Sequence, residues 1–448
     1  MAAENKMGTM PEGRLIITMS FPIMLSMLVQ ALYNIVDSAF VARISEDALT
    51  AVSLAFPVQL LMIAVATGAG VGVNALLSRR LGEKKQAEAD AVAVNGIFLS
   101  ICFWLIFAVL GLLFGRQFIA LFTDVPAVIE MGTSYVTVVT VASCGVFLLF
   151  VAERLMQATG NTFYHMVTQL IGAVLNCILD PIMIFGLFGF PALGTTGAAL
   201  ATVLSQIIAM SIGFFINVRF NHDVRIRLRG FRPDGRIIGE IVRIGLPAAV
   251  QQSLLSVLTV GLNRILMPFS QTAVGFYGVY YKLQNFLFMP VYGLNNALIP
   301  MIGYNFGAKN RRRIERITRY ALLLSLGIMA AGTLLFELLP VPLLRLFNAS
   351  DAMLAIGVPG IRIISVSFCL AGASVILCGC MQGLGRGSEP LWVALLRQLI
   401  VILPAAVLLS HISLTAVWFA FPLAEAVGLA AAFFLHHRVR RRLLDKLS

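Results

Sequence analysis

Long runs of apolar residues, separated by short polar stretches, occupy most of the chain from residue 15 to residue 437. Apolar runs of about 18 residues or more are typical of helices that span a membrane. Twelve such runs lie at residues 15–41, 51–77, 91–114, 131–156, 163–188, 194–218, 239–267, 273–304, 319–344, 353–382, 390–410 and 413–437. The pattern therefore predicts an all-α polytopic membrane protein with twelve transmembrane helices.

Short sequence phrases recur at a constant interval along the chain: Phe21-Pro22 matches Leu246-Pro247, and Met156-Gln157 matches Met381-Gln382. Such a regular recurrence indicates that one unit was duplicated and fused. Each copy holds six spans, an even number, so the second copy enters the membrane in the same orientation as the first. We therefore expect two six-helix bundles related by a parallel pseudo-twofold repeat.

This pattern predicts a division of the chain into three parts. Residues 1–218 form an N-lobe with helices 1–6, residues 219–238 a basic cytoplasmic linker, and residues 239–448 a C-lobe with helices 7–12 and a basic cytoplasmic tail. Two bundles that meet across an axis leave a cleft that can open to either side of the membrane. This geometry favours transport by alternating access.

Composition and charge fix the environment and the orientation. The chain has 448 residues, of which 59% are hydrophobic and 12% charged, with a mean hydropathy of +0.90, whereas soluble domains carry about 25% charged residues. The net charge is +12, and Lys and Arg gather after predicted helices 2, 6, 8 and 12. By the positive-inside rule both termini are cytoplasmic. We expect a monomer in the cell inner (plasma) membrane, with the lipid bilayer rather than nucleic acid beside its short basic loops.

A stripe of polar residues interrupts the first apolar run. Gln30, Tyr33, Asn34 and Asp37 follow the i, i+3, i+4, i+7 spacing that places side chains on one helix face. Because charged groups inside a bilayer cost at least about 2.5 kcal/mol, a carboxylate at this depth needs a reason. The stripe is thus a candidate part of a functional site.

The fifth and sixth spans add further polar residues at a similar depth. Asn176 and Asp180 share one helix face, and Thr202 lies in the next helix. Helices 1 and 5 run outward and helix 6 runs inward, so Asp37, Asp180 and Thr202 all lie within about four turns of the outer surface. We expect Asp37, Asn176, Asp180 and Thr202 to form one cation-coupling site.

The second half of the chain does not repeat this cluster. At the same interval, Gln30, Tyr33, Asn34 and Asp37 correspond to Leu255, Leu258, Thr259 and Leu262, and Asn176 and Asp180 correspond to Val401 and Ala405. A purely structural polar network would be equally useful in both bundles, so the asymmetry favours a functional site. Two carboxylates in a poorly solvated pocket repel each other, so the pair is expected to bind a proton, or else Na⁺ with the neutral oxygens of Asn176 and Thr202. No cofactor is expected beyond this coupling ion.

Several other buried positions suggest roles. Pro22, and its counterpart Pro247, lie early in helices 1 and 7, where a proline permits either a hinge or a fixed kink. Lys282 and Tyr281 are candidates to line the cleft, with Glu425, although an intrahelical pairing of Lys282 is the alternative.

Other charges are expected near the membrane interfaces. Arg397 lies near enough to the end of its span to reach the interface, and Glu153 and Arg154 are expected to be interfacial anchors.

These residues resemble those of the multidrug and toxic compound extrusion (MATE) transporters over essentially the whole chain. The resemblance rests on an ordered set of segments: Phe21-Pro22, Asp37, Asn176 to Pro181, Gly197-Ala198-Ala199, Met156-Gln157 and Met381-Gln382. It implies an efflux antiporter that exchanges cationic lipophilic compounds for H⁺ or Na⁺, with an ion site at Asp37, Asn176, Asp180 and Thr202 and a helix 1 proline that bends with it. Other branches of the family place carboxylates in helices 7 and 10, where this chain has Gln251, Gln252, Ala371 and Gly372 in the corresponding region.

Two other functions compete with a cation-coupled exporter. A lipid-linked saccharide flippase on the related two-bundle plan is expected to have several deep arginines facing a central cavity, whereas deep Lys and Arg are scattered here. A membrane-embedded enzyme needs a catalytic constellation, and the five histidines lie at span ends or in loops. The sequence therefore favours a transporter that is not an enzyme.

Overall fold

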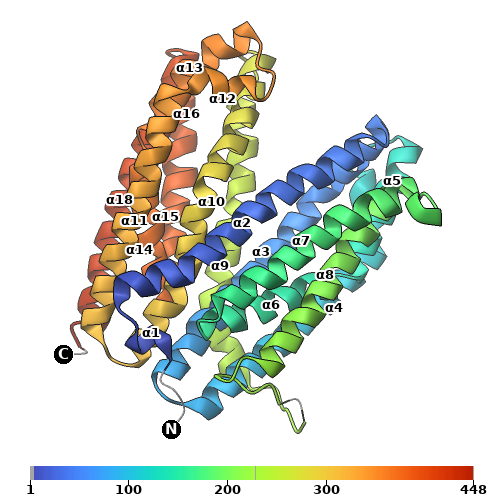
Figure 1. Cartoon of the computed structure of the whole chain (residues 1–448). Coiled ribbons are helices and arrows are strands. Elements are labelled where there is room, and N and C mark those ends of the chain that lie inside the picture. Colours follow the sequence, from blue (N-terminus) through green and yellow to red (C-terminus); the bar gives the residue numbers. More distant parts are fainter. Residues whose placement is uncertain (1–4, 228, 447–448) are drawn as a thin grey trace. The chain divides into compact units, whose positions relative to one another are not determined.

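The computed structural model describes residues 5–227 and 229–446, and the side chains of 34, 38, 39 and 42 are outside the description. Helices account for the secondary structure of this part of the chain, and no strand occurs in it (Figure 1). The chain forms two compact units. Unit 1 comprises Met1–Lys6 and Leu25–Ala249, and unit 2 comprises Met7–Met24 and Val250–Ser448.

The helices follow one another in chain order. In the first half they are α1 (Lys6–Thr9), α2 (Glu12–Ala42), α3 (Glu46–Gly82), α4 (Gln86–Ala120), α5 (Pro126–Val141), α6 (Cys144–Ala158), α7 (Thr162–Phe185), η1 (Leu187–Gly189) and α8 (Gly194–Arg219). In the second half they are α9 (Gly235–Leu266), α10 (Gln271–Gly307), α11 (Arg311–Leu338), α12 (Pro340–Arg345), α13 (Asp351–Ser365), α14 (Phe368–Gly383), α15 (Ser388–Leu395), the π-helix η2 (Leu396–Ile402), α16 (Leu403–Ser410), α17 (Leu414–Val417) and α18 (Ala420–Leu443).

The predicted set of membrane helices is confirmed. Within the described residues, ten helices are long and apolar enough to cross a membrane, and two bent pairs raise the number to twelve. The pairs are α5 with α6, bent by 41°, and α13 with α14, bent by 47°. They correspond to predicted spans 4 and 10, which occupy the same place in each half. The sequence did not predict these bends.

The duplication is visible in local geometry. α3 begins at Glu46 and ends at Gly82, and α10 begins at Gln271 and ends at Gly307, so both bounds repeat at the interval that relates Pro22 to Pro247. The N-cap serines also correspond: Ser45 accepts a hydrogen bond from the backbone N–H of Ala48, and Ser270 from that of Ala273.

The turns that follow also correspond. Lys84 and Lys309 both adopt a positive φ, 57° and 56°, in the turn after α3 and the turn after α10.

The division into units differs from the predicted lobe boundaries in two segments. Residues 7–24 belong to unit 2, and residues 219–249 belong to unit 1. Close packing explains both. In unit 1 a Cβ on Gly68 would lie 2.6 Å from the Gly245 carbonyl oxygen, and in unit 2 a Cβ on Gly293 would lie 2.7 Å from the Met24 Cα. Gly68 and Gly293 are repeat counterparts, and each lets a helix backbone approach closely.

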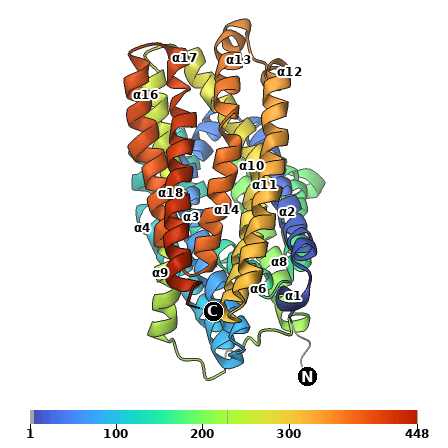
Figure 2. The same ribbon diagram turned by 90° about the vertical axis from the view of Figure 1, so that its left-hand side faces the viewer.

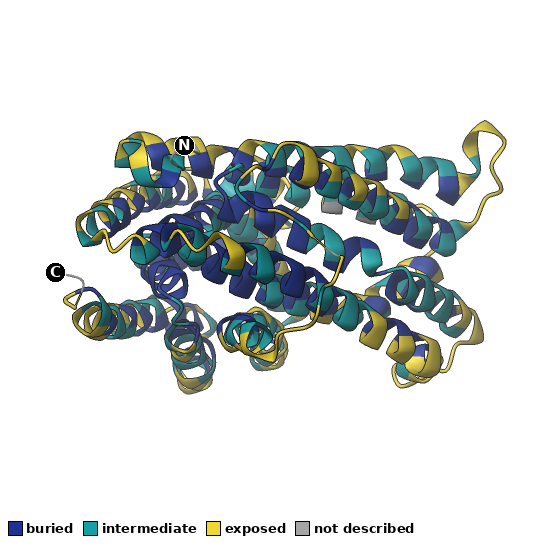
Figure 3. Ribbon diagram, turned by 90° about the horizontal axis from the view of Figure 1, so that it is seen from below, coloured by how far each residue is buried: buried dark blue, intermediate teal, exposed yellow. Residues whose placement is uncertain are grey.

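Each unit has its own apolar core. Unit 2 packs residues of α9, α10, α13, α14 and α18 into one cluster around Phe276, Phe368 and Trp418, and Figure 2 shows α14 between α11 and α18. Unit 1 packs two clusters, one around Phe147 and another around Leu77 and Leu155. Figure 3 shows exposed residues along the outer helix faces as well as in the loops. Many of these exposed residues are large and apolar, such as Leu112 and Phe433, as expected of surfaces that face lipid.

The predicted linker is tied to unit 1 at both ends. The Asp90 carboxylate accepts a hydrogen bond of 2.8 Å from the Arg225 N–H, and the Asn95 side-chain oxygen accepts one of 2.9 Å from the Asp234 N–H. Near its start, the Asn5 side chain donates to Asp223 at 2.9 Å. Burial raises the pKa of Asp223 above its ordinary value, against the opposing effects of Asn5, His222 and Lys6.

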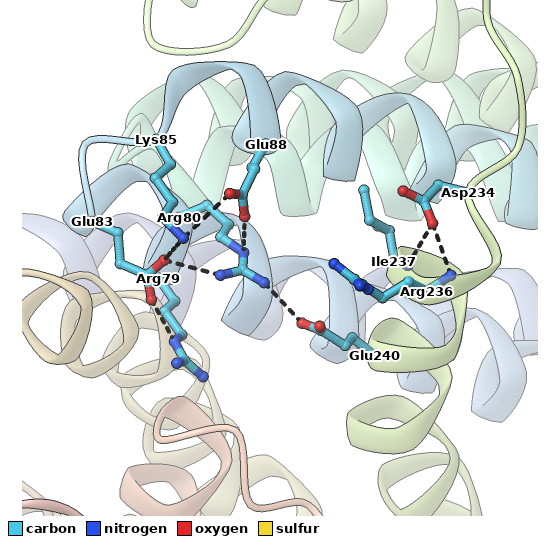
Figure 4. Close-up of polar contacts among 9 residues, drawn as sticks. All are labelled: Arg79, Arg80, Glu83, Lys85, Glu88, Asp234, Arg236, Ile237 and Glu240. Carbon is cyan, nitrogen blue, oxygen red and sulfur yellow. Dashed lines mark hydrogen bonds and ion pairs between the residues drawn. The ribbon is translucent and has the colours of Figure 1, made fainter.

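A network of ion pairs closes the same end of unit 1 (Figure 4). Arg80, in the last turn of α3, contacts Glu83 at 2.9 Å, Glu88 of α4 at 3.1 Å and Glu240 of α9 at 3.1 Å. Burial alone would raise the pKa of Glu83, but hydrogen bonds from Arg80 and Arg79 and their positive charges hold it below its ordinary value. One arginine thus joins the ends of three helices.

Candidate functional site

The residues predicted to bind a coupling ion lie together in unit 1. α2 carries Asp37, α7 carries Asn176 and Asp180 one turn apart, and α8 carries Thr202. α7 and α8 pack along their length, which brings Asn176 beside Thr202. Asp180 has no solvent-exposed surface, Asn176 is 2% exposed, and Asp37 is half-buried.

The two carboxyl groups meet. Those of Asp37 and Asp180 lie within hydrogen-bonding distance of each other. An ionised carboxylate accepts hydrogen bonds but donates none. Such a pair favours a proton held between the two residues, or a cation bound by both.

Asn176 bridges the pair to the next helix. Its side-chain nitrogen lies 3.4 Å from the Asp180 Oδ1 and 3.4 Å from the Thr202 Oγ1. Three buried oxygens at this place have no hydrogen-bond partner among the described residues: Asp37 Oδ1, Asn176 Oδ1 and Asp180 Oδ2. Buried polar atoms are costly when unsatisfied. An all-oxygen set of this kind suits a proton or a hard cation such as Na⁺.

Aromatic residues and an amide border the carboxyl pair. Tyr33, from the predicted stripe, and Tyr135 of α5 both lie near enough to Asp37 and Asp180 to be affected by their charge. Gln59 of α3 donates to the Tyr135 hydroxyl at 3.2 Å. Sequence reasoning missed Tyr135 and Gln59, because neither belongs to the polar stripe or repeats its spacing.

The other members of the stripe are less informative. Gln30 is half-buried, two turns before Asp37 on the same helix. Asn34 was predicted to support the site, and its side chain lies outside the described part of the chain.

The corresponding place in unit 2 is apolar, as the sequence indicated. Leu258 and Leu262, the counterparts of Tyr33 and Asp37, are 8% and 0% exposed and belong to the core cluster of that unit. Val401 and Ala405, the counterparts of Asn176 and Asp180, pack against the same cluster. The same helices thus enclose a polar site in one unit and ordinary packing in the other.

Pro22 lies inside the continuous helix α2 and is buried. The boundary between the segments assigned to the two units falls shortly after it, between Met24 and Leu25, and the equivalent boundary falls shortly after Pro247, between Ala249 and Val250. The prolines therefore lie where each long helix passes from one unit to the other. The hinge itself remains a prediction.

The candidate cleft residues of the second half lie in different surroundings. Lys282 is exposed and Tyr281 is half-buried. Glu425 is bound by Arg397, whose Nη1 lies 3.1 Å from both carboxylate oxygens. The expectation that Arg397 reaches the interface is wrong, because this pair holds its side chain inside the unit at 17% exposure.

A second polar cluster of unit 1 was also misjudged. Glu153 and Arg154, expected to be interfacial anchors, are each 6% exposed. Arg154 donates to the Gln157 side-chain oxygen at 2.7 Å, and the Gln157 nitrogen lies 3.2 Å from the His165 Nε2. The recurrence of Met156-Gln157 marked this place, but sequence alone did not show that the neighbouring charges point inward.

Comparison with known proteins decides the family. The sequence model of the MatE family matches residues 22–182 and again residues 247–408. The chain belongs to the MatE family. The two matches begin at Pro22 and Pro247, so the model covers each repeat once, and the predicted resemblance is confirmed.

Curated relatives match this MatE protein over nearly its whole length. Multidrug export protein MepA of Staphylococcus haemolyticus is 27% identical over 434 residues, which cover 96% of this chain and 94% of that protein. A protein of the same name from Staphylococcus aureus is 27% identical over 427 residues, covering 95% and 93%.

Solved structures share the fold. A crystal structure of MATE in complex with MaL6 gives a TM-score of 0.92 at 26% identity and covers 100% of both chains. A MOP superfamily transporter from Pyrococcus furiosus gives a TM-score of 0.91 at 25% identity over 99% of both chains. The reverse polarity of that protein's binding pocket is described as suggesting a different function. The MatE protein is therefore a multi-pass membrane transporter and not an enzyme.

Proposed function

We propose that this MatE protein is a multidrug efflux antiporter that exports cationic lipophilic compounds in exchange for H⁺ or Na⁺. The observation that carries the proposal is the contact between Asp37 and Asp180, two carboxyl groups from different helices of unit 1. Such a pair is stable in a water-poor place only when a cation neutralises part of its charge. The site therefore binds the coupling ion.

Binding of the ion and of the cargo must be linked for exchange to occur. An antiporter works when the ion and the cargo favour different conformations of one protein. Pro22 supports such a linkage, because it lies in the helix that carries Asp37 and close to the point where that helix passes between units. In the proposed cycle, α2 bends at Pro22 when the carboxyl pair takes up its ion.

The nature of the cargo is supported by relatives. Two of them are named multidrug export proteins, and a cation that enters and a cationic compound that leaves keep the exchange of charge small. Among the described residues of the spans, Arg154 of unit 1 is buried and donates to Gln157, and Arg397 of unit 2 is 17% exposed and pairs with Glu425. Both arginines are engaged by side chains of their own units rather than gathered at one place for a lipid pyrophosphate, which argues against the flippase.

The orientation follows from charge. The last turn of α3 carries Arg79 and Arg80, and the last turn of α18 carries Arg440, Arg441 and Arg442. Basic helix ends stay in the cytoplasm, so we assign both termini to the cytoplasmic side of the inner membrane. The protein is proposed to work as a monomer.

Transport in everted vesicles tests the proposal. The vesicles carry wild type, Asp37→Asn or Asp180→Asn, a proton or sodium gradient is imposed, and movement of a fluorescent lipophilic cation is followed. Gradient-driven transport is expected to fall at least about tenfold in both variants, because an amide cannot share a proton as a carboxyl pair does. Asp124→Asn, at an exposed position beyond α4, is the matched control and should transport as wild type does.

Two outcomes divide the possibilities. Transport that persists in both variants at the wild-type rate would remove Asp37 and Asp180 from the mechanism. Release of protons when cargo is added to the purified protein, lost in both variants, would assign H⁺ as the coupling ion, whereas dependence on a sodium gradient at constant pH would assign Na⁺.

A further inference from the structure

A groove lies between the first turn of α15 and the last turns of α18, within unit 2. Its volume is about 210 Å³, and it is lined by Arg386, Ser388, Glu389, Trp392, Leu435, Arg438, Val439 and Arg442. At about 30 Å³ for each molecule of liquid water, the groove has room for about seven waters. A phosphate group with its nearest substituents fits in this space.

The charge of the groove favours an anion. Three arginines line it, and Glu389 is the one acidic residue in the lining. That carboxylate lies 3.9 Å from Arg386. Among the described residues, neither Arg438 nor Arg442 has an ion-pair partner, although Arg440 of the same helix pairs with Glu315 at 2.9 Å. Two guanidinium groups therefore face the groove with no counter-charge of their own.

Apart from Ser388, the remaining lining is apolar, and its tryptophan faces the surroundings of the protein. Trp392 is 63% exposed, and Leu435 lies one turn of α18 before Val439. Tryptophan is enriched where membrane helices cross the boundary between hydrocarbon and headgroups. The groove thus presents arginines beside an exposed indole, at the end of two membrane helices.

The first repeat does not contain these groups on the matching helix. Arg386 and Trp392 correspond to Asn161 and Val167 at the repeat interval. Asn161 is used locally, with its side-chain nitrogen 3.2 Å from the Thr159 Oγ1 and 3.4 Å from the Asn221 Oδ1. The fold therefore does not require an arginine and a tryptophan here.

We propose that this groove binds the headgroup of an anionic phospholipid from the leaflet at the C-terminal end of α18. Arg438 and Arg442 contact the phosphodiester, Arg386 adds positive charge from the turn before α15, and the acyl chains pass along Trp392 and Leu435. Guanidinium groups suit phosphate oxygens because they donate two parallel hydrogen bonds. The groove is thus a lipid site in unit 2, separate from the ion site of unit 1.

Native mass spectrometry of the full-length protein with added phosphatidylglycerol or phosphatidylcholine tests the proposal. Wild type is expected to retain phosphatidylglycerol in preference to phosphatidylcholine. Each arginine near a membrane surface contributes about fivefold to the binding of an anionic lipid, so Arg438→Gln with Arg442→Gln should weaken retention by about 25-fold. Arg441→Gln removes the same charge from the same helix outside the groove lining and should have a much smaller effect.

A second readout uses the indole. Brominated phosphatidylglycerol should quench the fluorescence of Trp392 more strongly than brominated phosphatidylcholine, and the difference should vanish in Trp392→Phe and in the double arginine variant. Equal retention by the double variant and Arg441→Gln, or equal binding of the two lipids by wild type, would overturn the proposal. Displacement of phosphatidylglycerol by inorganic phosphate at equal concentration would show a site for free phosphate and would overturn the lipid assignment.

Discussion

Single side chains make the two bundles chemically different, although their helices correspond. Asp37 and Asp180 have Leu262 and Ala405 as counterparts, and the second pair belongs to or packs against an apolar core. Small residues also differ between the two units. Gly70 of α3 leaves room for Arg154 of α6, whereas in unit 2 the counterpart positions are Asn295 of α10 and Gly379 of α14.

The Gly379 position yields a prediction for stability. A Cβ there would lie 1.7 Å from the Asn295 Oδ1 and 2.8 Å from its Cγ. Gly379→Ala is therefore expected to destabilise the protein by about 1–3 kcal/mol through overpacking, seen as a lower Tm in detergent. Asn295→Ala removes the obstructing atoms, so the double variant should recover most of the loss.

A matched glycine serves as the control. Gly327 of α11 has no atom within 4 Å of an added Cβ, so Gly327→Ala should leave the Tm unchanged or raise it slightly, because alanine favours the helix. An equal loss of stability in Gly379→Ala with and without Asn295→Ala would contradict the packing explanation.

The sequence allowed part of the ion site to be predicted and not the rest. The spacing of Tyr33 and Asp37, and of Asn176 and Asp180, defines helix faces, because the period of a helix is fixed. Tyr135 and Gln59 join the site through tertiary packing, which no local spacing reports. The inward direction of Arg397 and Arg154 was missed for the same reason, since each depends on how its helix packs against the others.

Helix ends hold the elements of unit 1 together. Arg80 joins the end of α3 to the start of α4 and to α9 through Glu83, Glu88 and Glu240 (Figure 4). Side chains of Arg80 and Glu83 are 16% and 18% exposed, so water screens their contact less than that of a surface pair. Arg80 thus has a structural role in addition to contributing to the positive charge from which the orientation is assigned.

Glu83 yields a prediction for pH dependence. Its pKa in the folded protein lies below its ordinary value of 4.5, so the ionised carboxylate stabilises the fold at neutral pH, and this contribution disappears as pH falls through the lowered pKa. The Tm of Glu83→Gln should lie below that of wild type from about pH 7 to pH 5, and the difference should vanish at lower pH.

An exposed carboxylate provides the comparison. Glu130→Gln, in the first turns of α5, should not reproduce the pH-dependent difference. A Glu83→Gln variant whose Tm differs from that of wild type by the same amount at every pH would show that packing, and not charge, is responsible.

For the whole molecule, the repeat determines how the long helices α2 and α9 are divided between the two units. α2 contributes residues up to Met24 to unit 2, and α9 contributes residues up to Ala249 to unit 1, at positions that correspond in the two repeats. The duplication could be predicted from the sequence, because Pro22 and Pro247 stand at corresponding positions of the two repeats. The sequence did not predict this division of the two helices, because the glycines that allow it, Gly68 and Gly293, are two among 38.

Each unit also uses an arginine to anchor the start of the helix segment it receives, but at different repeat positions. In unit 1 the arginine is Arg80, which contacts Glu240 of α9. In unit 2 the counterpart of Arg80 is Asn305, and the arginine is Arg313, the counterpart of Glu88. Arg313 donates to the Asn305 Oδ1 at 3.2 Å and to the carbonyl oxygens of Met7 at 3.1 Å and Met10 at 2.7 Å.

Arg313→Gln should therefore loosen the amino-terminal segment of unit 2. Hydrogen bonds from a charged donor contribute about 1.5–3 kcal/mol each, so loss of those to Met7 and Met10 should raise amide hydrogen exchange across residues 7–24 by about tenfold or more. Arg312→Gln removes an equal charge from an exposed neighbour and should leave that exchange unchanged. Equal exchange in the two variants would mean that apolar packing of Met7, Leu15 and Met19, each fully buried, holds the segment without the arginine.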